Sequence, residues 1–163
     1  MRGLVLIPLA LLAGCASAPA ERAVATPSSN AAAAASAAET ERNRAVVTAF
    51  FDLFYTQKKV REAFETYVVP GYIQHNPIAP DGRDAAIAAL EPFFRNVPTL
   101  NYSIQRIIVD GDLVAVHAHM KMNEADRGNA VIDIVRLENG KIVEHWDVIQ
   151  AVPEKSANPH PMF

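Results

Sequence analysis

The feature that most constrains the fold is a change in the spacing of apolar residues after residue 100. Beyond this point apolar and polar residues alternate, which is the pattern of half-buried strands. The alternation predicts four strands, over Tyr102–Val109, Leu113–Met122, Val131–Leu137 and Lys141–Gln150. Asp110-Gly111 and Asn139-Gly140 are typical of tight hairpin turns. We therefore expect an antiparallel meander.

The preceding part of the chain has helical spacing instead. Thr40 is a candidate N-cap, and an apolar stripe follows it at Val46, Val47, Phe50, Phe51 and Phe54. A shorter stripe ends at Pro70-Gly71, and a third begins at Arg83, where Pro92 is expected to kink or end the helix. Helices followed by a meander predict an α+β domain with the three helices packed on one face of an antiparallel sheet.

The N-terminus has the pattern of a secretion signal. Arg2 is followed by an uncharged apolar run that is too short to span a membrane, and the run ends at Leu12-Ala13-Gly14-Cys15. This ending resembles a bacterial lipobox, which implies a lipid anchor on Cys15; an ordinary signal peptide is the alternative. Ala16 stands where inner-membrane lipoproteins carry Asp, so the resemblance implies the periplasmic side of the outer membrane.

Composition divides the chain into three parts. We expect a signal peptide over residues 1–14, a lipidated Cys15 with a flexible tether over 15–38, and one domain over 39–163. The tether is mostly Ala with Ser, Pro and Thr, which cannot bury enough apolar surface to fold. The net charge of −3 gives no basic surface, so nucleic acid is not an expected partner.

Asp133 is the leading catalytic candidate. It lies within Val131-Ile132-Asp133-Ile134-Val135, and a carboxylate among apolar neighbours must pair, gain a proton or face a cavity. Desolvation raises the basicity of a carboxylate, as proton removal from carbon requires. The alternative is that Asp133 pairs with Arg136 or a lysine on a solvated sheet face.

The histidines give further candidates. His117 and His119 share one face of their strand, either beside Asp133 or exposed on an edge. As a His-x-His pair they also match two metal ligands, although no third ligand accompanies them at characteristic spacing. His145 and Asp147 share a face and are expected to form a local pair. His75-Asn76 lies where a strand meets a loop, which suits a binding group or a plain turn.

Four segments together carry a family resemblance: Tyr72-Ile73-Gln74-His75-Asn76-Pro77, Asp81-Gly82-Arg83, Asp133 to Leu137, and Asn139 to Val148. They resemble the SnoaL-like polyketide cyclases of the nuclear transport factor 2-like superfamily. The resemblance implies an α+β cone around a pocket, a homodimer, and an intramolecular aldol condensation without metal or organic cofactor.

The resemblance also implies roles for individual residues. Asp133 corresponds to the base, His117 or His119 to the group that polarises the substrate, and Asn76 to a loop donor. We expect Tyr72, His75, His145 and Asp147 to contact the ligand as well.

Taken together, the sequence predicts a membrane-tethered domain with a pocket for a small apolar or carbonyl-bearing molecule. It favours cofactor-free acid–base chemistry of the cyclase or isomerase type. A non-catalytic module that binds a ligand or a protein in the cell envelope is the main alternative, and a zinc hydrolase built on His117 and His119 is a third. Polyketide cyclases are not usually periplasmic lipoproteins, so the fold carries over better than the reaction.

Overall fold

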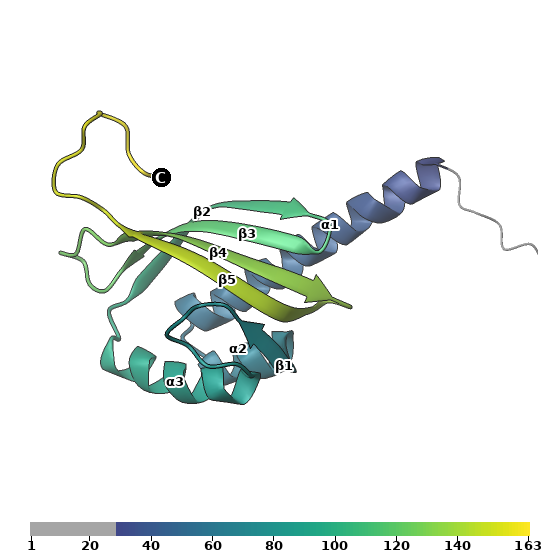
Figure 1. The fold of residues 1–163 in the computed structure, drawn as a ribbon, viewed down its shortest axis with the longest axis horizontal. Helices are drawn as coiled ribbons and strands as arrows, with labels where there is room; N and C mark the ends of the chain where they lie inside the picture. Colours follow the sequence, from purple (N-terminus) through teal and green to yellow (C-terminus); the bar gives the residue numbers. More distant parts are fainter. Residues whose placement is uncertain (1–28) are drawn as a thin grey trace, which may run out of the picture.

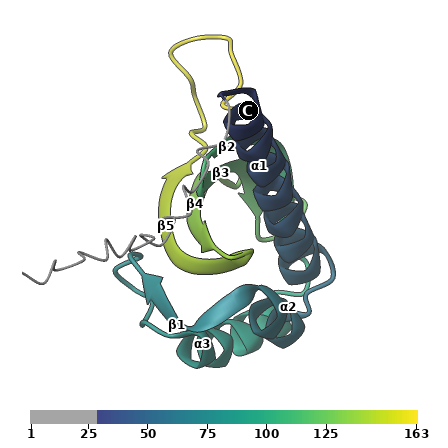
Figure 2. The same ribbon diagram turned by 90° about the vertical axis from the view of Figure 1, so that its right-hand side faces the viewer.

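Residues 29–163 are described by a computed structural model; the expected signal peptide, Cys15 and the first part of the tether lie outside them. The helices and strands follow the order α1 (Ser29–Phe51), η1 (Asp52–Thr56), α2 (Val60–Tyr67), β1 (Val68–Gln74), α3 (Arg83–Asn96), β2 (Asn101–Asp110), β3 (Leu113–Lys121), β4 (Asn129–Glu138) and β5 (Lys141–Ala151). The helices cover the concave side of a strongly curved sheet (Figures 1 and 2). The predicted α+β cone is confirmed.

The sheet has the strand order β1-β5-β4-β3-β2. The meander β2 to β5 is antiparallel throughout, as the alternation predicts. β1 joins the free edge of β5 in parallel, and its register shifts between Val68 and Ile73, where Pro70 and Gly71 lie. An edge strand tolerates proline because the N–H on its outer side has no ladder partner. The strand therefore runs through the Pro70-Gly71 pair.

α1 begins earlier than expected. The helix starts at Ser29 rather than at a cap on Thr40, so residues 29–38 of the predicted flexible tether are helical. Alanine is the best helix former, and nothing between Ala31 and Glu39 interrupts the run. These turns project beyond the sheet, and side chains from Asn30 to Glu39 are exposed, so they add nothing to the core (Figure 1). Among residues 29–163, no helix has both the length and the apolarity to cross a membrane.

The ends of the other helices follow from packing. Lys58 has a φ of +55° and interrupts the helical conformation between η1 and α2, as the Lys58-Lys59 pair predicts. α3 continues four residues past Pro92 instead of ending there. Its last turn is held by Phe94, which is buried and lies 5.1 Å from the ring centroid of Phe54. The burial of this ring outweighs the lost backbone hydrogen bond at the proline.

One face of the sheet belongs to the core. On β3, Val114, Val116 and Ala118 are fully buried beneath the helices. Residues paired across antiparallel strands point to the same side, so Asp133, opposite Val116, also faces the helices. We call this the inner face and its reverse the outer face.

A bulge near the start of β5 changes the predicted alternation. Leu137 pairs with Ile142, whereas Arg136 pairs with Glu144, which leaves Val143 as an extra residue. Ile142 and His145 therefore both face inward, although strict alternation predicts that they point to opposite sides. The hairpin before the bulge turns at Asn139 and Gly140, with φ of +51° and +73°, as expected for this dipeptide.

Candidate active site

A pocket of about 270 Å³ lies between the inner face and the helices. Aromatic and aliphatic side chains form most of its wall, including Phe50, Phe54, Tyr55, Phe64, Leu90 and Ile142. Its polar residues come from three strands and the loop after β1: Gln74, Asn76, Asp133, His145 and Asp147. Among the described residues that line it, none is a lysine or an arginine. Such a pocket suits an uncharged ligand with one polar end.

Asp133 is the most buried of the polar residues and is only 4% exposed. The Tyr102 hydroxyl donates a hydrogen bond to its Oδ2, and the Nε2 of His145 lies 2.9 Å from its Oδ1. Arg136 does not pair with it, because that guanidinium contacts Glu144 and Glu138 on the outer face. The carboxylate thus lies inside the pocket with two polar partners, which offset the cost of its burial.

Tyr102, which contacts Asp133, and Tyr55, which lines the pocket, both keep their protons. Burial raises the pKa of Tyr102, and the negative charge of Asp133 raises it further. The same two causes, in the same order, raise the pKa of Tyr55 well above its usual value. The two rings stack with a centroid distance of 3.8 Å. Tyr102 therefore remains a hydrogen-bond donor to Asp133 throughout the physiological pH range.

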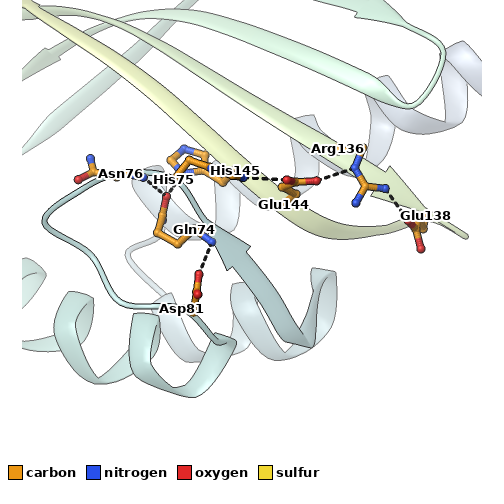
Figure 3. A network of polar contacts seen from close by, with 8 residues as sticks. All are labelled: Gln74, His75, Asn76, Asp81, Arg136, Glu138, Glu144 and His145. Carbon is orange, nitrogen blue, oxygen red and sulfur yellow. Dashed lines mark hydrogen bonds and ion pairs between the residues drawn. The ribbon is translucent and has the colours of Figure 1, made fainter.

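His145 reaches Asp133 through the register of β4 and β5. Val135 pairs with His145 and Asp133 pairs with Asp147, so the ring approaches the carboxylate diagonally. Its Nδ1 lies 2.9 Å from Oε1 of Gln74 at the end of β1, and Figure 3 shows Gln74 beside the ring. One imidazole thus bridges an edge strand and the buried carboxylate.

Asp147 carries the second carboxylate of the pocket. The side-chain amide of Asn76 donates to both of its oxygens, at 2.9 and 2.7 Å. Asn76 is itself oriented by the backbone N–H of Ile78, which donates to its Oδ1 at 3.0 Å. Asn76 and Asp147, two of the residues expected to contact the ligand, therefore line one pocket, and their mutual contact is a feature that the sequence did not predict.

The structure corrects the expectation for His117 and His119. Both lie on the outer face, because the three buried residues of β3 occupy the inner one, and neither is among the described residues lining the pocket. His117 Nδ1 lies 2.7 Å from a guanidinium nitrogen of Arg106, and burial followed by the Arg106 charge lowers its pKa. The Nε2 of His119 donates to the Arg127 carbonyl at 2.7 Å. Phe163 stacks on both rings, so the C-terminal tail returns to the domain.

His75 also lies off the pocket. Its Nε2 is 2.7 Å from Oε1 of Glu144, and its ring stacks on Trp146 with a centroid distance of 4.7 Å. Glu144 also accepts a bond from Arg136 at 2.7 Å, and Figure 3 shows this chain of contacts. These hydrogen bonds, that of His75 first, lower the pKa of Glu144. These contacts hold His75 on the outer face, where it does not line the pocket.

Sequence reasoning missed Gln74 and Tyr102 and gave Tyr72 only a general role. Tyr72 is buried in the pocket wall, where the Nε2 of Gln74 donates to its hydroxyl at 3.1 Å. Alternation along Tyr72, Gln74 and Asn76 is the signal that could have found Gln74. Tyr102 lies 31 residues from Asp133 and gives no local signal of its contact with it.

The polar residues of the pocket could also hold a metal cation. Ligand atoms of Asp133, His145 and Asp147 all lie within 4.8 Å of one another. Each of these atoms already has a protein partner, and a metal would have to separate the His145 ring from Asp133. The contact between Asp133 and His145 therefore suits proton transfer between these two residues better than metal coordination.

Comparison with known proteins agrees with this geometry. The family model of the SnoaL-like domain matches residues 47–145. The chain belongs to the SnoaL-like domain family. No curated protein matches the chain.

Solved structures share the fold of this SnoaL-like domain. A protein from Jannaschia sp. CCS1, named for its likeness to SnoaL-like polyketide cyclases, has 22% identity and a TM-score of 0.59, over 68% of this chain and 87% of that one. A Bacillus cereus protein named similarly for polyketide cyclases has 23% identity and a TM-score of 0.56, over 66% and 74%. TsrD from Streptomyces laurentii has 22% identity and a TM-score of 0.53, over 65% and 89%.

Proposed function

We propose that this SnoaL-like domain catalyses cofactor-free proton transfer on a small, uncharged carbonyl compound. The observation that carries the proposal is the contact of the buried Asp133 carboxylate with the His145 ring inside an apolar pocket. The fold family, whose structural neighbours include polyketide cyclases by name, supports a reaction of the cyclase or isomerase type.

In this reaction Asp133 takes a proton from a carbon next to the carbonyl group. The electrons of the broken C–H bond move to the carbonyl oxygen, and the resulting enolate accepts a hydrogen bond from Nε2–H of His145. In a cyclisation the enolate carbon then attacks a second carbonyl of the same molecule, and the proton held by Asp133 passes to the new alkoxide. In an isomerisation it returns to a different carbon. Either route leaves the site in its starting state.

Charge and volume narrow the ligand class. The two carboxylates of the pocket, Asp133 and Asp147, disfavour an anionic ligand, and the described lining offers no lysine or arginine to offset them. The volume of about 270 Å³ lies just below the range of roughly 300–1,000 Å³ typical of pockets for drug-sized ligands. This supports a ligand with one or two rings rather than a tetracyclic polyketide.

Deuterium exchange tests the proposal with simple ketones as probes in place of the natural substrate. Cyclohexanone, indanone and a ketone of matched size that carries a carboxylate are incubated with the protein in D₂O, and deuterium uptake is followed by NMR. We expect uptake into the two neutral ketones, little into the anion, and loss of uptake in Asp133→Asn. Binding without uptake, seen as ligand line broadening, would support the non-catalytic binding module instead.

The cell-envelope location belongs to the same proposal. The Leu12-Ala13-Gly14-Cys15 motif supports a lipid anchor on Cys15 and a domain tethered at the periplasmic side of the outer membrane. Metabolic labelling with an alkyne fatty acid tests it in bacterial cells. The wild-type chain should be labelled and sediment with outer membranes, whereas Cys15→Ser should lose both properties; label retained in Cys15→Ser would contradict the anchor.

A homodimer formed through the outer face is the third part of the proposal. Ile108 and Val148 are 61% and 65% exposed there, as expected for a surface that a second copy covers. Light scattering should give twice the chain mass, and Val148→Asp should halve it. Ala37→Asp, on the exposed start of α1, is the matched control. A wild-type monomer would contradict this part alone.

A further inference from the structure

The orientation of the Gln74 side-chain amide is fixed by its neighbours. The backbone N–H of Asn76 lies 2.9 Å from Oε1, and a backbone N–H can only donate, so this atom must be the oxygen. On the other side of the amide, Nε2 donates to the Tyr72 hydroxyl at 3.1 Å. The backbone N–H of Gln74 donates to Asp81 at 2.8 Å, which holds the end of β1 in place (Figure 3).

This orientation determines which nitrogen of His145 carries a proton. The Nδ1 of the ring lies 2.9 Å from the same Oε1, which has no hydrogen to donate. Nδ1 must therefore be the donor. The ring's other nitrogen, Nε2, faces Oδ1 of Asp133 at 2.9 Å.

We infer that Gln74 is a positioning residue that fixes the tautomer of His145 and thereby reserves Nε2 for proton exchange. The contact between Nε2 and Oδ1 then needs one proton, since two lone pairs at 2.9 Å repel. The proton rests either on the imidazolium or on the carboxylic acid. Without Gln74, a neutral ring is free to move its proton from Nδ1 to Nε2 and to donate it permanently to Asp133.

The catalytic meaning of this inference rests on the proposed function, but the tautomer does not. A ring held with Nδ1–H can pass the Nε2 proton to an enolate oxygen and take it back. A ring in the opposite tautomer is neutral and leaves a lone pair on Nδ1, so its Nε2–H can still donate to the enolate but is a weaker acid than the Nε2–H of the imidazolium. In the Ser-His-Asp proteases, loss of the group that fixes the histidine tautomer lowers kcat by about 10⁴-fold.

The test is ¹⁵N NMR of histidine-labelled protein, in which protonated and unprotonated ring nitrogens have well-separated shifts. For wild type we expect His145 Nδ1 in the protonated range. Gln74→Met should bring an unprotonated Nδ1 and a protonated Nε2. Gln74→Glu, which keeps an acceptor, should preserve the wild-type pattern. Gln105→Met, an exposed glutamine on β2, is the matched control and should change nothing.

Activity gives a separate readout. We expect Gln74→Met to slow deuterium uptake by on the order of tenfold or more, with little change in ketone affinity, and Gln74→Glu to restore most of it. An unprotonated Nδ1 in wild type, or an unchanged spectrum in a folded Gln74→Met, would overturn the inference. If Gln74→Met does not fold, the wild-type and Gln74→Glu spectra decide it. Absence of uptake in wild type would count against the proposed function and leave the tautomer assignment standing.

Discussion

His145 Nε2 lies 2.9 Å from Asp133 Oδ1, and the two residues belong to neighbouring strands at diagonal positions. His145 is placed there by the bulge at Val143, because the extra residue lets both Ile142 and His145 face inward. The contact is thus a product of strand register rather than of proximity in sequence.

Replacement of the His145 ring should separate the roles of the histidines. His145→Gln should lower the rate of ketone deuteration by about 10²–10⁴-fold, because the enolate loses its donor. His117→Gln and His119→Gln should keep the wild-type rate, since both rings lie on the outer face. NMR uptake rates of the three variants provide the measurement. A loss confined to His117→Gln or His119→Gln would mean that the outer face carries the chemistry.

Removal of the Tyr102 hydroxyl should destabilise the domain. Tyr102→Phe leaves the buried Asp133 with one partner fewer, at a cost of about 1–3 kcal/mol in the free energy of unfolding. Urea denaturation checks this value. Tyr67→Phe is the control, since the Tyr67 hydroxyl makes no hydrogen bond among the contacts described for residues 29–163. Equal stability of the two variants would show that the bond to Asp133 contributes nothing.

The aromatic wall of the pocket should carry much of the stability. Phe54 is 6% exposed and lies against Phe50, Phe64 and Phe94. Phe54→Ala should therefore lower the free energy of unfolding by about 3–5 kcal/mol. Ile78→Ala, at a side chain that is 92% exposed, should stay within about 0.5 kcal/mol of wild type. Thermal and urea unfolding of both variants test the contrast.

Glu144 should make stability depend on pH at the acidic end. Its pKa in the folded protein is lowered below the usual 4.5, so the unfolded chain binds the proton more readily. The ionised group therefore stabilises the fold above pH 4.5, and this contribution is lost as pH falls through the lowered pKa. Glu144→Gln should unfold more easily than wild type near neutrality and approach it in acid.

Urea midpoints measured from neutral to acidic pH give this difference directly. Glu154→Gln, at an exposed position of the C-terminal tail, is the control and should keep a constant offset from wild type. A constant offset for Glu144→Gln as well would mean that its contacts with His75 and Arg136 add no pH-dependent stability.

Local pattern explains how much of the site could be predicted from the sequence. Alternation of Val131, Asp133 and Val135 indicated one apolar face, and the carboxylate does lie on it. The same rule, applied to β3, assigns the apolar face to Val114, Val116 and Ala118 and so turns His117 and His119 outward. The family resemblance favoured a histidine on that strand as the partner of Asp133, and in this chain β5 supplies the histidine instead.

The sequence by itself determined the order of helices and strands, the hairpin turns and the apolar face that Asp133 shares with Val131 and Val135. These follow from spacing and turn chemistry, which act between residues close in the chain. Only the tertiary structure decided that Gln74 and Tyr102 meet the acid–base pair, because β1 joins β5 in parallel and β2 closes the far edge. It also decided the bulge that aims His145, since strand register depends on long-range packing that no local pattern contains.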